Sequence, residues 1–258
     1  MADPLRNRSR AAAFLCYHSI HEDGPEWLSV APSTFAAQLE ALSARGWGSG
    51  TESDLRGAAA GRAPGERPLA YLTFDDGFAD NHETAFPLLR DHGLTAMFFV
   101  LPSHLDGRAL DWPEVAGDHE DHPEVMRSLT WAQVEEMAEA GMEFGSHGLA
   151  HSHLPELSDE ELRQELVDSR RLIAERLGSC AMLAYPFGDW DGRVAAAAAE
   201  AGYEFAFTLP RSHQRRVGPL SIPRVSVDFR DDAGRFAMKL RPLGRRLYLS
   251  RLKTMLRR

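Results

Sequence analysis

Two acidic residues and two histidines in this 258-residue chain have the types and spacing of a metal-dependent hydrolase site. Asp75 and Asp76 follow an apolar run and precede a glycine, so a turn there lets both carboxylates face one site. His147 and His151 lie four residues apart, which stacks their rings on one side if the segment turns helically. A carboxylate and two imidazoles make a three-ligand site with open positions, as in catalytic zinc centres.

The chemistry that such a site implies is hydrolysis of an amide or an ester. A bound divalent metal lowers the pKa of water and polarises a carbonyl, and the second carboxylate is then free to act as a base. Each pair also has a structural interpretation. An Asp-Asp-Gly triplet is most often a solvated acidic turn, and the two histidines could be unrelated loop residues among the eleven in the chain.

Three short segments resemble motifs of the NodB-homology polysaccharide deacetylases, carbohydrate esterase family 4. They are LTFDDG at 72–77, SHGLAH at 146–151 and YPFG at 185–188. The opening LCYHSI at 15–20 is similar to the start of the poly-N-acetylglucosamine deacetylase branch of that family. The resemblance implies a metal-dependent hydrolase, acting on linear amide C–N bonds, that removes acetyl groups from N-acetylated sugars in a polysaccharide or glycan precursor.

The resemblance also implies a role for several side chains. Asp75 would be the general base, while Asp76, His147 and His151 would hold a divalent metal, most commonly Zn²⁺. His18 would be the general acid that protonates the leaving amine, a role that the poly-N-acetylglucosamine branch gives to an N-terminal Tyr-His pair.

The YPFG segment is expected to complete the site. The backbone N–H of Phe187 would stabilise the oxyanion, which requires a fixed donor about 3 Å from the developing charge. Tyr185 and Pro186 would contact substrate, and Trp190 could stack on a sugar ring.

Two departures from the family pattern concern the base and the acid. Ala184 occupies the place of the arginine that usually contacts the base, and Arg224 could supply that guanidinium from another strand. The usual Asp-x-x-Asp-Trp motif is absent, and Asp228 is the nearest candidate to orient His18.

Strand-like and helix-like runs alternate along the chain, which predicts a parallel sheet covered by helices, as a barrel or an open sheet. The candidate residues follow predicted strands, where the chemistry of barrels is found. With the family resemblance, we expect an α/β fold, a distorted, incomplete (β/α) barrel, as one domain at 12–230.

Apolar runs predict strands at 13–17, 69–74, 95–101, 142–146, 181–185, 203–208 and 220–227. Periodicity and caps predict helices at 32–45, 79–92, 130–141, 158–177 and 193–201, and the runs 57–67 and 102–128 predict loops.

Charge is distributed unevenly over the chain. The formal net charge of −9 argues against nucleic-acid binding, whereas residues 239–258 hold eight Lys or Arg and no Asp or Glu. We expect 231–258 to be a basic tail or an amphipathic helix, which could touch an anionic membrane, dock on the acidic body or stay disordered. The apolar run at 11–16 is too short for the hydrophobic part of a secretory leader, so we expect a cytoplasmic location, at the inner membrane surface if the basic tail binds there.

Two other functions stay open at this stage. Asp75 and a second acid could form the carboxylate pair of a glycosidase. The missing arginine and aspartate motifs would also suit a catalytically impaired barrel that only binds carbohydrate. The partner in each case is a glycan, and nothing in the sequence indicates an oligomeric state.

Overall fold

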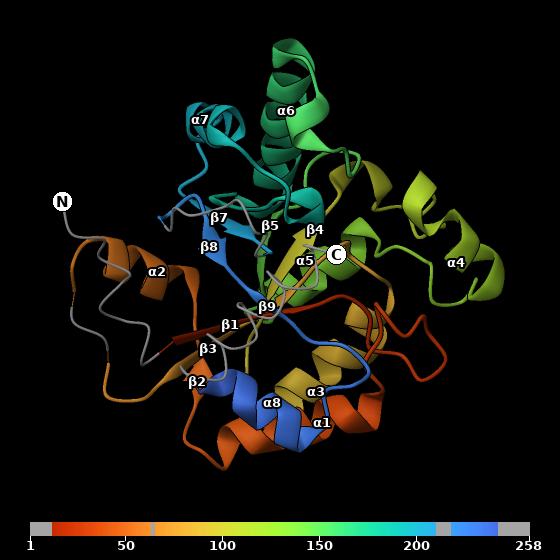
Figure 1. The fold of residues 1–258 in the computed structure, drawn as a ribbon, viewed down its shortest axis with the longest axis vertical. Coiled ribbons are helices and arrows are strands. Elements are labelled where there is room, and N and C mark those ends of the chain that lie inside the picture. Colours follow the sequence, from red (N-terminus) through yellow and green to blue (C-terminus); the bar gives the residue numbers. More distant parts are fainter. Residues whose placement is uncertain (1–11, 63–64, 210–217, 242–258) are drawn as a thin grey trace, which may run out of the picture.

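The computed structural model describes residues 12–62, 65–209 and 218–241, which form a parallel sheet surrounded by helices (Figure 1). The strands are β1 (Ala12–Tyr17), β2 (Gly48–Ser49), β3 (Leu69–Phe74), β4 (Met97–Val100), β5 (Glu143–Ser146), β6 (Met182–Ala184), β7 (Phe205–Thr208), β8 (Ile222–Pro223) and β9 (Val225–Ser226). The α-helices are α1 (Pro32–Ser43), α2 (Glu52–Ala59), α3 (Phe86–Asp91), α4 (Ala116–Asp121), α5 (Trp131–Glu139), α6 (Asp159–Leu177), α7 (Gly192–Glu200) and α8 (Ala233–Leu240). A π-helical turn, η2 (Asn81–Ala85), and the 3₁₀ turns η3 (Pro102–His104), η4 (Pro113–Val115), η5 (Leu154–Glu156) and η6 (Pro186–Gly188) complete the set.

The sheet curls into a nearly closed barrel. Its strand order is β8-β7-β6-β5-β4-β3-β1-β9, with β2 added beside β3. The two ends of this order, β8 and β9, are separated in the chain by Arg224 alone. One short segment therefore pairs with β7 and then with β1, and it draws the two edges together. The predicted (β/α) barrel fold is confirmed.

Alternation along the strands divides the side chains between the inside and the outside of the barrel. Phe14 of β1 stacks on Tyr71 of the neighbouring β3 at 4.4 Å, and it also reaches Phe207 of the distant β7 at 6.1 Å. Such a contact between strands that are far apart in the sheet requires both rings to point inward. Residues of β1 and β3 two positions further on, Cys16 and Thr73, face the same way.

Helices cover the outside through a larger apolar cluster to which strands and helices both contribute. Figure 1 shows α1, α3 and α8 together on one side of the barrel and α6 with α7 on the opposite side. Helix α8 packs against α1, and its Phe236 and Leu240 belong to this cluster. The beginning of the predicted basic tail is thus part of the packed body, while 242–258 lie outside the described residues.

The predicted loop at 57–67 begins too early, because α2 occupies Glu52–Ala59. Thr51 accepts a hydrogen bond from the Asp54 N–H, and the Asp54 carboxylate accepts one from the Thr51 N–H, so both ends of the first turn are capped. The predicted loop at 102–128 likewise contains three short helical turns, η3, η4 and α4.

The predicted helix at 79–92 is divided. Its first part is the π-helical turn η2, and α3 starts only at Phe86. Pro87 has no N–H to donate to the preceding turn, which breaks the regular hydrogen-bond ladder at this point. The predicted strand at 220–227 is divided as well, because Arg224 separates β8 from β9.

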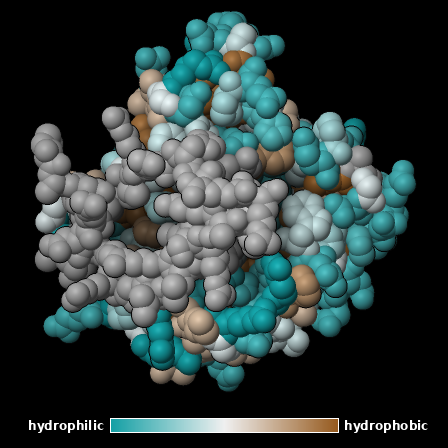
Figure 2. Space-filling view, viewed as in Figure 1, coloured by the Kyte–Doolittle hydropathy of each residue, from teal (hydrophilic) through white to brown (hydrophobic). Residues whose placement is uncertain are grey.

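Within the described ranges, no helix combines the length and apolar character that crossing a bilayer requires. On the face drawn in Figure 2, the described surface is mainly hydrophilic with scattered apolar residues. The predicted membrane contact of the tail stays a prediction.

Candidate metal and catalytic site

Asp75 and Asp76 lie in a tight turn that begins as β3 ends. Asp76 and Gly77 both have left-handed backbone angles, with φ of 71° and 74°. This turn brings two consecutive carboxylates, 2% and 5% exposed, to the same end of the barrel, as the triplet predicts. Strand β3, buried from Ala70 to Phe74, holds the turn in place.

Asp76, His147 and His151 converge on one point. Asp76 Oδ1 lies 3.2 Å from His147 Nε2 and 3.3 Å from His151 Nε2. Ligands about 2.0–2.1 Å from a tetrahedral metal are separated from one another by about 3.3 Å. Asp76 Oδ1 is buried and has no hydrogen-bond partner among the described residues, so the three atoms are arranged as ligands of a shared cation. The residues present therefore fit a divalent metal.

The loop that carries both histidines is held by helix α6, and it does not make the helical turn that would have stacked residues four apart. Gly148 and His151 have φ of 83° and 59°, which no helical turn contains. The Glu165 carboxylate of α6 accepts hydrogen bonds from the N–H groups of Leu149 and Ala150, at 2.8 and 2.9 Å.

The His147 ring is oriented by a second contact. Its Nδ1 lies 2.8 Å from the Ala184 carbonyl oxygen and donates to it, which leaves the lone pair on Nε2 free for a metal.

Backbone strain is concentrated at the site. Among the described residues, the non-glycine positions with positive φ are Asp76, His151 and Phe187. A left-handed conformation is unfavourable for such side chains and persists where surrounding contacts impose it. The fold therefore stores strain at two proposed metal ligands and at the proposed oxyanion donor.

Arg224 pairs with Asp75 as a fork. Its two terminal nitrogens each donate to one oxygen of Asp75, both at 2.6 Å, and one also donates to Thr73 Oγ1 at 2.9 Å. Arg224 is fully buried and its guanidinium lies over the rings of Phe99 and Phe207 inside the barrel. The guanidinium expected from another strand therefore does reach Asp75.

This pairing decides the charge of Asp75. Burial disfavours the carboxylate, but the charge and hydrogen bonds of Arg224, together with the nearby His147 and His18, outweigh it and lower the pKa of Asp75 below its usual value. Asp75 is therefore ionised at neutral pH and held in one orientation.

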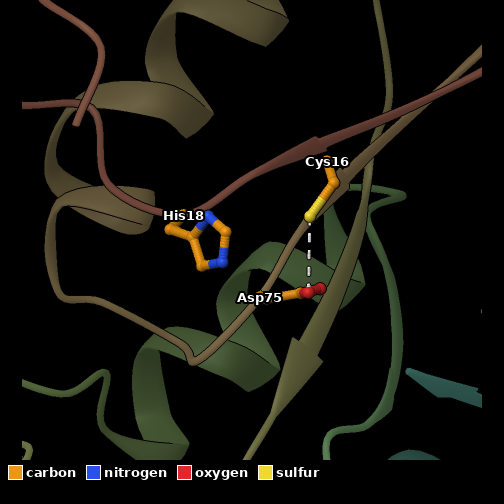
Figure 3. Close-up of side chains that lie close together, drawn as sticks. All are labelled: Cys16, His18 and Asp75. Carbon is orange, nitrogen blue, oxygen red and sulfur yellow. Dashed lines mark hydrogen bonds between the residues drawn. The ribbon is translucent and has the colours of Figure 1, made fainter. Parts of the chain in front are cut away.

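Cys16, His18 and Asp75 form a second cluster beside the first (Figure 3). Cys16 Sγ donates to Asp75 Oδ2 at 3.4 Å. Burial raises the pKa of the Cys16 thiol well above its usual value, so the residue is a neutral donor. Because Arg224 already holds both oxygens of Asp75, this cluster fits acid–base chemistry rather than a second metal.

His18 faces this cluster from the end of β1 and is partly exposed. Burial lowers the pKa of His18, and the nearby Asp76 and Asp75 only partly offset that effect. The prediction that Asp228 orients His18 does not fit the structure, because the Asp228 carboxylate binds Arg230 at 2.6 and 3.0 Å. Within the described chain, no hydrogen bond reaches the His18 ring.

Aromatic rings line the metal-ligand side of the site. Trp112 is 7% exposed and stacks on His151 at a centroid distance of 4.3 Å. Phe187 lies edge-on to His151 at 4.4 Å, and His153 stacks on Phe187 at 3.8 Å. These contacts fix both His151 and the strained Phe187 backbone.

The predicted substrate contacts of Tyr185 and Pro186 do not fit their burial. Both side chains lie in the interior, and Tyr185 Oη donates to the Leu220 carbonyl at 3.0 Å. Trp190 is partly exposed and parallel to Tyr185 at 6.1 Å, so it is the one of the three that a sugar can contact.

Sequence reasoning missed Cys16 and Glu165 as parts of the site. The position of Cys16, near the end of β1 and two residues before His18, was an available signal, because alternation that continues past the strand end places both on the same face. Glu165 gave no local signal, since it lies within a long charged helix.

A buried carboxylate and two imidazoles that fit a divalent metal, with a second carboxylate beside them at the end of a (β/α) barrel, are the groups that a metal-dependent hydrolase requires. The family model described as "Polysaccharide deacetylase" matches residues 62–206. The chain belongs to the polysaccharide deacetylase family, and this confirms the predicted family and the predicted function, a carbohydrate deacetylase. Enzymes of this family use a divalent metal.

Known proteins resemble the chain over most of its length. The YxkH protein of Bacillus subtilis (strain 168) is 29% identical over 217 residues, covering 83% of this chain and 70% of the relative. The deacetylase PplD of Streptococcus pyogenes, solved in complex with acetate, superposes with a TM-score of 0.75 at 24% identity, covering 90% of this chain and 98% of that one. IcaB from Ammonifex degensii gives 0.69 at 23% identity, covering 84% and 92%. These two structures support the fold.

Proposed function

We propose that this protein is a zinc-dependent de-N-acetylase in which Asp76, His147 and His151 hold the metal and Asp75 is the base. The observation that carries the proposal is the convergence of Asp76 Oδ1 with the Nε2 atoms of both histidines at 3.2 and 3.3 Å. Two imidazole nitrogens and one carboxylate oxygen are a donor set that suits Zn²⁺. When bound, the metal would polarise the acetamide carbonyl and lower the pKa of water.

The chain's own residues move the protons. Asp75, ionised through Arg224, takes the proton of the attacking water. His18, whose ring lies beside Asp75, gives a proton to the departing nitrogen, which leaves as a free amine together with acetate. The Phe187 N–H is the proposed donor to the oxyanion, and its strained backbone is held by the rings of His151 and His153.

We propose N-acetylglucosamine units of a glycan as the substrate. The LCYHSI segment with His18, which is similar to the poly-N-acetylglucosamine branch, supports this choice, and so does the overall likeness to IcaB. Trp190, partly exposed beside the YPFG segment, is the proposed sugar-stacking residue.

Metal analysis combined with acetate release from N-acetylglucosamine oligomers tests the proposal. We expect about one metal ion per chain, acetate release by the loaded protein, and loss of release after chelation. Asp75→Asn should retain the metal and lose turnover, whereas His147→Ala should lose the metal.

Four outcomes would contradict the proposal. Normal turnover by Asp75→Asn would exclude it as the base, and full metal content in His147→Ala would remove it from the ligands. Chelator-resistant release of reducing ends without acetate would favour the glycosidase, and glycan binding without acetate release would favour the impaired barrel.

A further inference from the structure

We propose that Asp80 and Asn81 are positioning residues for His18, forming a polar clamp that fixes the acid relative to the base. The inference rests on the proposed role of His18 as the proton donor to the leaving nitrogen. It concerns two side chains to which the proposed reaction gives no part.

Asp80 holds the residues that follow His18. Asp80 Oδ2 accepts a hydrogen bond from Ser19 Oγ at 2.6 Å, and Asp80 Oδ1 accepts one from the Ile20 N–H at 3.0 Å. Asp80 is 5% exposed, so these bonds are shielded from water. Both partners are within two residues of His18 in the chain.

Asn81 holds His18 itself. Its Nδ2 donates to the His18 carbonyl oxygen at 2.8 Å and to Asp80 Oδ1 at 3.0 Å. Asn81 is fully buried. The two side chains therefore bind the backbone on both sides of Ser19, which fixes the direction in which the chain leaves β1.

The clamp binds His18 through its backbone carbonyl oxygen and not through its ring. No hydrogen bond from the described chain reaches the ring, so the ring takes its place from its own backbone and from packing. An error of about 1 Å in the place of a catalytic group can cost about 100-fold in rate.

The clamp also joins the two proton-transfer groups. Asp80 and Asn81 begin the helical turn that follows the Asp75–Asp76 turn, separated from it only by residues 77–79. That short connection is itself held, because the Ala79 N–H donates to the Arg127 carbonyl at 2.7 Å. The base and the clamp on the acid therefore belong to one continuous segment.

Two substrates distinguish positioning of the acid from a general structural role. Hydrolysis of an N-acetylated sugar expels a poor amine leaving group that must be protonated, whereas 4-nitrophenyl acetate expels a phenolate that needs no proton. Both reactions use the metal and Asp75. A displaced His18 should slow only the first.

We expect Asp80→Ala to lower kcat for N-acetylglucosamine oligomers about 10- to 100-fold with KM and metal content unchanged, while kcat for 4-nitrophenyl acetate changes less than about 3-fold. Asp80→Asn keeps the oxygen that accepts from Ile20 and should restore most of the loss. Thr51→Ala, which removes the cap of the remote helix α2, is the control and should affect neither substrate.

Equal losses on both substrates, or an unchanged kcat on the oligomers, would overturn the inference. If Asp80→Ala does not fold, Ser19→Ala removes a single bond of the clamp and decides by the same comparison. His18→Ala separates the two proposals. If it loses oligomer hydrolysis selectively and the clamp variants do not, only this inference fails; if it shows no selective loss, the acid role fails and the inference with it.

Discussion

Arg224→Met should expose how much the fold depends on the pair that Arg224 forms with Asp75. The variant removes two hydrogen bonds of 2.6 Å and leaves a carboxylate only 2% exposed without its partner. Breaking a buried ion pair from one side costs about 3–5 kcal/mol, because the remaining charge is desolvated and uncompensated. We expect a loss of that size in the free energy of urea unfolding at pH 8, measured on chelator-treated protein.

The loss should depend on pH with a defined sign. In the native protein the pKa of Asp75 is lowered, so its stabilising effect is present above the unfolded pKa and disappears as pH falls through the folded pKa. Without Arg224, burial is opposed only by the nearby His147 and His18, so the pKa of Asp75 rises from its value in the native protein. The variant can then relieve its penalty by taking up a proton, so its deficit should be smaller at pH 5 than at pH 8.

A double-mutant cycle isolates the pair. Asp75→Asn combined with Arg224→Met removes both charges and should recover at least about 2 kcal/mol relative to the sum of the single losses. Arg56→Met is the control, because the pairs of Arg56 with Glu52 and Glu204 are exposed and should contribute less than about 1 kcal/mol. A deficit below about 1 kcal/mol for Arg224→Met at pH 8, or equal deficits at both pH values, would refute the reasoning.

Variants at three further residues test other contacts. Glu165→Ala should weaken zinc binding about 10-fold or more in a competition titration, because the histidine loop loses both of its bonds to α6, whereas Glu165→Gln should bind within about 3-fold of wild type. Burial raises the pKa of Glu143 to about 7, above the unfolded value of 4.5, so stability is lost as pH rises between these values. The free energy of urea unfolding at pH 8 should therefore be about 1–2 kcal/mol higher for Glu143→Gln than for wild type, after discounting for solvent screening. The difference should be smaller at pH 5. Ser158→Ala removes the N-cap of α6 and should cost about 1 kcal/mol by the same assay with kcat unchanged; a cost near zero would show that packing alone defines that helix end.

Local signals in the sequence predicted most of the fold. The strand at 69–74 has the predicted bounds, and the long helix α6 begins after its predicted cap, Ser158. Helix α2 was missed because it is eight residues long and contains a glycine, although its Thr51–Asp54 cap was there to be read. The C-terminal helix α8 lies within 231–258, where an amphipathic helix was one of the predicted alternatives, but the sequence pattern did not give its bounds.

In the site, too, features that depend on adjacent residues were predicted, and features that depend on distant contacts were not. The carboxylate turn depends on adjacent residues, so the triplet predicts it. The partner of Asp75 is 149 residues away and could only be guessed from its type. The failures of Tyr185 and Asp228 have one cause, because a motif gives a residue's place in the chain and not the direction of its side chain.

Closure of the barrel and the state of the base follow from the same residue. Arg224 lies between the two strands that join opposite ends of the sheet, and its side chain points inward to Asp75. In the usual family pattern the guanidinium precedes the YPFG segment, where this chain has Ala184, whose carbonyl instead orients His147. Here the guanidinium belongs to the residue between β8 and β9, so Asp75 is paired only when both of these strands are in register. Any change that separates β8 from β7 or β9 from β1 should therefore raise the pKa of Asp75. Loss of barrel closure and loss of the ionised base then occur together.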